Sequence, residues 1–379
     1  MTDTTKKIFS RVLAIGVSAA MISSTFGCGR KVVEFEDYPT AGIEGEENVK
    51  EEVSEPAVKL EISDDELFLP EKNTFLETGV YVYNPLVIPE WILDEFKDRP
   101  EIIKISKQAL FAIDNHEKEL VLDEKQELSE QDIIDIYKVV YFSNPVTSIV
   151  MVSPTDKKNV FELEYFVGEE LAEDDEAVSV IEDFRNYITE TINENLSSDM
   201  SEKEMAAILY KKLITDIDFE PEGKEYLGGI GSTYVADEII KVPTDHKLTS
   251  GDDLIRLYLF FLSQLHIDSI RVGTASGFFT QDVKDVLGDK TPTAYYWEWT
   301  ILSLDGEYYN NDIILEKLVF DEKYQGAEGA EPLMSYFAMS DDTRFKSYKV
   351  GKSSVFSTNV FDPAQGTAAA VPKCEKDYE

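Results

Sequence analysis

Side chains able to act as nucleophiles or bases are scarce in this sequence. Its 379 residues include two cysteines and three histidines. Catalysis by a thiol or a hydroxyl needs such a group together with a base that removes its proton. Disulfide frameworks and metal sites built from clustered cysteines are excluded by the count alone. The candidates are therefore few: Cys28, Cys374, His116, His246 and His266.

A serine is the remaining candidate nucleophile, at the start of a predicted helix. Ser250 is followed by Gly251, Asp252 and Asp253, so an acidic residue stands three positions after it. This spacing predicts an N-cap with two negative charges in the first helical turn. The same carboxylates would oppose a nucleophilic anion, so we favour the cap. A hydrolase or acyltransferase that uses Ser250 is the alternative.

The acidity of the chain restricts its partners. A formal net charge of -39 disfavours nucleic acid, because nucleic-acid-binding proteins neutralise phosphates with lysine and arginine. The alternating acids Asp216, Asp218, Glu220 and Glu222 lack the central glycine and closing glutamate of an EF-hand loop. A half-buried strand edge explains them as well. We expect neither a metal nor a cofactor.

The N-terminal residues are typical of an export signal. Basic residues precede an apolar stretch over residues 12–22, which is short for a membrane-spanning helix. Residues 25–29, Thr-Phe-Gly-Cys-Gly, resemble a bacterial lipobox. We therefore expect a signal peptide over residues 1–27 and a lipid anchor at Cys28 that holds the protein on the outer face of the cell membrane. Ordinary signal cleavage with a secreted product is the alternative.

The two ends of the mature chain are predicted to be unfolded. Residues 28–66 are rich in acidic residues, proline and glycine and cannot bury enough apolar surface to fold, so we expect a tether. Residues 351–379 are expected to form a flexible tail with Cys374 as an exposed lone thiol. If Cys28 escapes lipidation, a disulfide between Cys28 and Cys374 is the alternative.

Residues 67–175 predict a small α+β module. Residues 80–83 alternate valine and tyrosine, which predicts a short strand. Apolar residues at helical spacing predict a helix over residues 131–141. The β-branched run at 148–152 and the alternating run at 161–165 predict two further strands.

Two consecutive helices are predicted next. Apolar residues recur at helical spacing over residues 174–196, which predicts a long amphipathic helix. Ser201, with Glu204 three residues later, matches a capping box. A second helix is therefore expected to begin directly after Ser201.

Three later stretches resemble bacterial transglutaminase-like domains. Residues 202–219 are similar to the helix that precedes the active site of that family. Residues 250–272 are similar to its catalytic helix and the strand that follows. Residues 297–312, with Trp-Glu-Trp, an Asp-Gly turn, an aromatic pair and a final aspartate, resemble its next strands. The resemblance implies a papain-like α+β fold over residues 176–350, with an antiparallel sheet packed on helices.

The resemblance also implies an active site that has lost its chemistry. The catalytic cysteine, histidine and aspartate of the family correspond to Gly251, Trp297 and Asp312, so only the carboxylate is present. A carboxylate without a thiol or a base to orient cannot perform acyl transfer. We therefore expect a pseudoenzyme, a protein with the fold but without the activity.

An aromatic cluster occupies these positions. If the strand alternates, Tyr295, Trp297 and Trp299 share one face, and Trp297 fills the former cleft. Core packing is the default interpretation of such a cluster. The functional alternative is a groove of Tyr295, Trp297, Trp299, Tyr308 and Asp312 that binds an extracellular protein, peptide or glycan. A structural envelope spacer is the third hypothesis.

Overall fold

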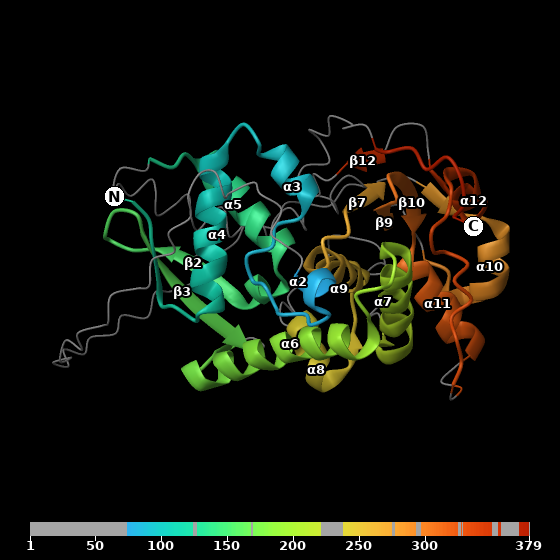
Figure 1. Ribbon diagram of the computed structural model, residues 1–379, viewed down its shortest axis with the longest axis horizontal. Helices are drawn as coiled ribbons and strands as arrows, with labels where there is room; N and C mark the ends of the chain where they lie inside the picture. The colour runs from blue at the N-terminus through green and yellow to red at the C-terminus, as the bar shows by residue number, and fades with distance from the viewer. Residues whose placement is uncertain are drawn as a thin grey trace, which may run out of the picture.

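The computed structural model describes residues 74–123, 127–167, 170–220, 238–274, 277–292, 297–324, 327, 329–350, 355–357 and 371–378. The predicted signal peptide, Cys28 and Tyr295 lie outside the described residues. Helices and antiparallel sheets are mixed along the chain, as the sequence predicts (Figure 1). Within the described ranges, no helix combines the length and the apolar character that crossing a membrane requires.

The N-terminal half combines helices with a small antiparallel sheet. Its helices are α2 (Thr74–Thr78), α3 (Glu90–Glu95), α4 (Pro100–Asp114), α5 (Glu130–Ser143) and the 3-10 helix η2 (Pro145–Ile149). Its strands are β1 (Glu119–Val121), β2 (Val150–Pro154), β3 (Val160–Val167) and β4 (Glu170–Leu171). They are ordered β1-β3-β2, and β4 also pairs with β3. The helix predicted over residues 131–141 and the strands predicted around 150 and 163 are confirmed.

The strand predicted over residues 80–83 is wrong, because this segment belongs to no sheet. Side-chain amides take the place of a neighbouring strand. Asn193 accepts a hydrogen bond from the Tyr81 amide (2.8 Å) and donates one to the Tyr81 carbonyl (3.1 Å). The Gln264 side chain likewise accepts a hydrogen bond from the Asn84 amide (3.2 Å) and donates one to the Asn84 carbonyl (2.9 Å). Buried backbone groups need partners, and these two amides supply them.

The long helix α6 (Asp174–Asn195) confirms the prediction for this segment and runs along the lower edge of the molecule, from below β3 to α7 (Figure 1). Arg185 on one side forms an ion pair with Asp114 of α4 at 2.7 Å. The ring of Phe184 lies 5.8 Å from that of Phe260 in α9 (Gly251–Gln264). Buried side chains from both halves form one continuous core around α6.

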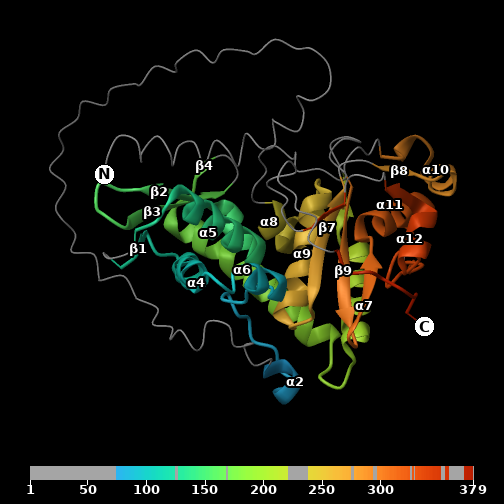
Figure 2. The same ribbon diagram turned by 90° about the horizontal axis from the view of Figure 1, so that it is seen from above.

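The C-terminal half packs helices on both faces of a four-stranded antiparallel sheet (Figure 2). The strand order is β10 (Glu307–Asn311), β9 (Trp297–Leu304), β7 (Ser269–Thr274) and β12 (Val355–Ser357). Helix α9 covers one face, and α12 (Asp341–Ser347) lies on the other. The remaining helices are α7 (Glu202–Asp216), α8 (Glu238–Asp245), α10 (Gln281–Leu287), η3 (Gly288–Lys290) and α11 (Ile313–Tyr324). Strand β8 (Gly277–Phe279) pairs antiparallel with β11 (Tyr348–Val350), and β5 (Asp218–Phe219) pairs parallel with β6 (Lys247–Leu248).

Two local predictions in this half are confirmed. The Ser201 hydroxyl accepts from the Glu204 amide at 3.3 Å, and the Glu204 carboxylate accepts from the Ser201 amide at 2.8 Å. This reciprocal capping box begins α7. Asp305 and Gly306 turn the chain between β9 and β10 with φ of 54° and 79°. Only residues that tolerate a left-handed backbone suit such a turn.

Residues 371–378, which we call the C-terminal strap, contradict the expectation of an exposed thiol. Cys374 is a free thiol but only 1% exposed. Its carbonyl accepts from the Asp341 amide at 2.9 Å, and the Tyr378 amide donates to the Ala338 carbonyl at 3.0 Å. Burial raises the pKa of the Cys374 thiol to about 12. A protonated, covered thiol is a poor nucleophile.

Candidate functional site

The N-terminus of α9 is where the resemblance places the missing nucleophile. Gly251 is the first helical residue, and Ser250 is its N-cap. The Ser250 hydroxyl accepts a hydrogen bond from the Asp252 amide at 3.2 Å, and the side chain is 1% exposed. The capping role predicted for Ser250 is therefore confirmed, and its oxygen serves the helix backbone.

Replacing Ser250 by alanine is expected to lower the free energy of unfolding by about 1 kcal/mol, because one helical N–H loses its acceptor. Ser250→Gly should lose only a few tenths of that amount, since glycine is a tolerable N-cap. Urea denaturation of the two variants measures the difference. Equal stability of the native protein and Ser250→Ala would contradict the capping role.

Trp297 and Asp312, which the resemblance aligns with a base and an orienting acid, are in direct contact. The indole Nε1–H donates to Asp312 Oδ2 at 2.7 Å, and both side chains are at most 1% exposed. The other Asp312 oxygen accepts from the Leu315 amide at 3.0 Å, at the start of α11. The rings of Phe279 and Tyr348 lie 4.7 and 6.2 Å from that of Trp297. Asp312 therefore has two structural partners and no base to orient.

Burial raises the pKa of Asp312 to about 6, although its hydrogen bonds from Trp297 and Leu315 act in the opposite direction. A carboxyl whose pKa is higher in the folded than in the unfolded protein stabilises the fold when protonated. Its contribution is largest below about pH 4, declines as the pH rises to 6, and is then constant.

The stability of the native protein relative to Asp312→Asn should therefore fall by about 3 kcal/mol between pH 4 and pH 7. Urea denaturation of both proteins across this range provides the measurement. A difference that is independent of pH would show that Asp312 titrates normally in the folded protein.

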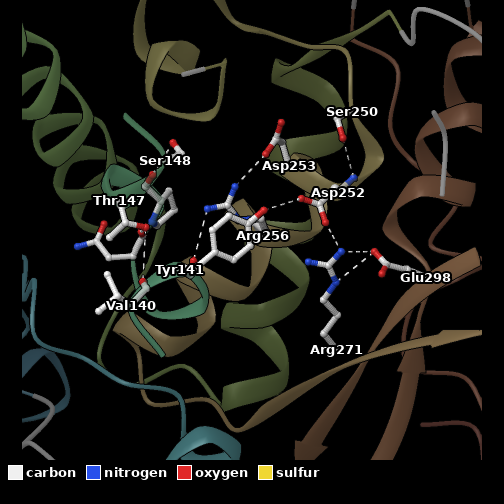
Figure 3. A network of polar contacts seen from close by, with 12 residues as sticks. Val140, Tyr141, Thr147, Ser148, Ser250, Asp252, Asp253, Arg256, Arg271 and Glu298 are labelled. Carbon is white, nitrogen blue, oxygen red and sulfur yellow. Dashed lines mark hydrogen bonds and ion pairs between the residues drawn. The ribbon is translucent and has the colours of Figure 1, made fainter. Parts of the chain in front are cut away.

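A buried ion network joins the N-terminus of α9 to the sheet (Figure 3). Arg271 of β7 donates to Glu298 of β9 and to Asp252 of α9, with Arg271 Nε to Glu298 Oε2 at 3.1 Å. Arg271 and Glu298 are each 1% exposed. Arg256 pairs with Asp253 at 3.2 Å, and its guanidinium carbon lies 4.0 Å from the centre of the Tyr141 ring.

The arginines of this network favour the ionised form of Asp252 at the N-terminus of α9. Burial alone would raise the pKa of Asp252, but Arg271 and Arg256 outweigh it and hold that pKa below its usual value. Asp252 follows Gly251, and Glu298 follows Trp297. A carboxylate–guanidinium–carboxylate chain thus connects the two neighbourhoods in which a catalytic thiol and base would stand.

All three histidines come just after the end of a helix and have a left-handed backbone conformation. His116, His246 and His266 follow helices and adopt φ of 55°, 50° and 55°. At the end of α9, the His266 backbone amide donates to the Ser263 carbonyl (3.0 Å), and the Ile267 amide donates to the Leu262 carbonyl (2.9 Å). This is the Schellman pattern, in which glycine is usual. Among the described residues none of the histidines is hydrogen-bonded to Ser250, and His246 is exposed whereas Ser250 is buried.

The residues assigned to a possible binding groove are mostly covered. Trp297 and Trp299 are 0% and 3% exposed, and Trp299 Nε1 donates to Asn310 Oδ1 at 2.9 Å. Tyr308 is 36% exposed, and Tyr295 lies outside the described residues. Side chains buried to this extent contact a ligand only after their neighbours move. Core packing is the better interpretation of Trp297.

The acidic alternation near β5 pairs with lysines. Asp216 lies 2.7 Å from Lys212, and Glu220 lies 2.7 Å from Lys247. Across the part of the chain that the structure describes, no cluster of histidine, cysteine, aspartate or glutamate has a geometry that would hold a metal ion. Glu222 lies outside that part.

No protein-family model matches this chain, and no curated protein does. The transglutaminase-like interpretation therefore depends on the residues and on their geometry. Sequence reasoning missed two buried arginines, Arg271 and Arg344. Arg271 stands between Ile270 and Val272, and Glu298 stands between two tryptophans. A charge inside an apolar run is the signal that could have identified this pair.

Proposed function

We propose that this chain is an exported cell-surface lipoprotein, anchored through Cys28, whose transglutaminase-like domain is catalytically inactive. It acts by binding or assembling an extracellular protein, peptide or glycan. The observation that carries the proposal is the hydrogen bond from the Trp297 indole to Asp312, at the position of the family's base.

The chemistry of an indole supports inactivity. Acyl transfer requires a group that takes a proton from the nucleophile and later returns it. Indole Nε1–H is a donor only, so Trp297 accepts no proton from a hydroxyl or a thiol. Gly251 has no side chain, and Ser250 is engaged as a helix cap. Binding and assembly need none of these groups.

The arrangement of elements is consistent with the proposed domain. Helix α9 precedes β7, and β9 and β10 form an antiparallel hairpin that ends next to Asp312. This order matches the order implied by the resemblance. Fold alone does not define function, so the proposal depends on the chemistry of the three positions.

Covalent labelling tests the inactivity. The native protein and Ser250→Ala are incubated with a fluorophosphonate probe, and labelled peptides are identified by mass spectrometry. We expect no label on Ser250 in the folded protein. Labelling that disappears in Ser250→Ala would establish a serine hydrolase and overturn the proposal.

Metabolic labelling with a fatty acid tests the anchor. We expect incorporation into the native protein and into Ser250→Ala, and none into Cys28→Ala. A secreted, unlabelled native protein would remove the lipoprotein part of the proposal while leaving the inactive domain in place.

A further inference from the structure

Arg344 is a buried cation on the face of the sheet opposite α9. It belongs to α12 and is 3% exposed. Its guanidinium carbon lies 3.3 Å from the centre of the Trp299 ring and 5.5 Å from that of Tyr348. The aromatic faces account for the position of the side chain, because a guanidinium stacks well on them.

Two of the three nitrogens of the Arg344 guanidinium are not used in hydrogen bonds. Nε and Nη2 are buried and have no hydrogen-bond partner among the residues that the structure describes, and the same is true of the Tyr348 hydroxyl. Asp341 directs its carboxylate to the side-chain amide of Asn310 (3.0 Å) and to the backbone of Cys374 (3.3 Å). Asp312 directs its oxygens to Trp297 and to the backbone of α11. The two carboxylates whose charges act on Arg344 are therefore already engaged.

An arrangement of this kind opposes folding. Two nitrogens of a buried cation lose their hydration here without gaining a hydrogen bond, and stacking on aromatic rings does not replace those bonds. Burial accordingly lowers the pKa of Arg344 to about 10, although Asp312 and Tyr348 act to raise it. Buried polar groups in native proteins almost always have partners, so a missing partner requires an explanation.

The identity of the unpaired atoms indicates the chemistry of that partner. The Nε–H and one Nη2–H bond of a guanidinium are parallel and form a side-on fork that donates to both oxygens of one carboxylate. The unpaired edge of Arg344 is this fork. The Tyr348 hydroxyl can supply a third hydrogen bond, and the aromatic rings provide a dry surrounding that strengthens it.

We propose that Arg344 and Tyr348 form the receiving site for a carboxylate group on the ligand of this protein. This inference rests on the proposed function, since it names the chemistry that the binding domain recognises. A peptide C-terminus and an acidic sugar share this chemistry. Because Arg344 is covered, neighbouring side chains must move before the ligand enters, and association should be slower than diffusion.

Tryptophan fluorescence provides a direct test on the full-length mature protein. The chain has three tryptophans, and Trp299 lies under the guanidinium. N-acetylglycine, glucuronate and inorganic phosphate are titrated at constant ionic strength, with N-acetylglycine methyl ester as the uncharged control. We expect a saturable change with one of the carboxylates and none with the ester. The peptide-like and the sugar probe distinguish the two sources.

Variants assign the signal to the site. Arg344→Met should abolish it, Arg344→Lys should weaken binding about tenfold because the fork is lost, and Tyr348→Phe should weaken it severalfold. Trp299→Phe should bind but lose most of the signal, which calorimetry can check. Binding of phosphate alone, or an equal response in Arg344→Met, overturns the proposal.

A second measurement does not depend on the choice of probe. Without ligand, the thermal midpoint of Arg344→Met should equal or exceed that of the native protein, because a buried cation with two unpartnered nitrogens is removed. A strongly lowered midpoint would show that the guanidinium is satisfied within the chain and would overturn the site. Neither result affects the labelling of Ser250, so the site and the proposed inactivity fail separately.

Discussion

Replacing Arg271 by methionine is expected to lower the free energy of unfolding by about 3 to 5 kcal/mol, because it leaves the buried Glu298 and the half-buried Asp252 without this cation. Arg271 and Glu298 are each 1% exposed, and Asp252 bonds to the same guanidinium. Methionine fills much of the same volume, so the loss of stability measures the removal of the charge rather than a change in packing. Urea denaturation at neutral pH and moderate salt measures it.

Two controls separate the network from a general effect of charge. Arg271→Met combined with Asp252→Asn and Glu298→Gln should recover most of the lost stability, since no buried charge is left unpaired. Lys157→Met breaks a pair with Glu119 whose lysine is 68% exposed, and it should change stability by less than about 1 kcal/mol. A loss for Arg271→Met as small as that for Lys157→Met would contradict the buried network.

Trp297→Ala should destabilise the protein by about 3 to 5 kcal/mol, because it opens a large cavity in a packed core. The indole is 0% exposed and lies edge-on to Phe279. The substitution also removes the donor to Asp312 Oδ2. Calorimetric or urea unfolding at pH 7, where Asp312 is ionised, should show the full effect.

A more conservative variant isolates the hydrogen bond. Trp297→Phe keeps most ring contacts and loses the indole N–H, so we expect a loss of about 1 to 3 kcal/mol at pH 7. The loss should shrink below pH 5, where a protonated Asp312 no longer needs the donor. Trp91→Phe is the matched control at a partly buried indole. A pH-independent loss for Trp297→Phe would show that packing alone is involved.

Local signals predicted the helices α5, α6, α7 and α9. The apolar spacing of α6 and the Ser201–Glu204 capping box both concern contacts within a few residues, and both are confirmed. The cap at Ser250 and the turn at Gly306 are of the same kind. Such features depend on backbone geometry that neighbouring residues determine.

The errors concern partners distant in sequence. Tyr81 resembles a strand residue, but its backbone bonds to Asn193, 112 residues away. Cys374 stands in a polar segment, yet Asp341 and the core cover it. The candidate positions Trp297 and Asp312 came from a resemblance, whereas the fork of Arg344 is visible only once its surroundings are known. Sequence periodicity indicates which face of an element is buried, but it does not identify the residues that pack against that face.

Helix α6 contacts both halves of the molecule, and these contacts determine how the protein unfolds. Arg185 of this helix forms an ion pair with α4, and Phe184 packs against Phe260 of α9. Separating the two halves would therefore expose apolar surface of both to water. We therefore expect the two halves to unfold together, with loosening at one transmitted to the other. A disturbance of the sheet beside Trp297 is therefore expected to register as a change in the cooperativity of the entire chain.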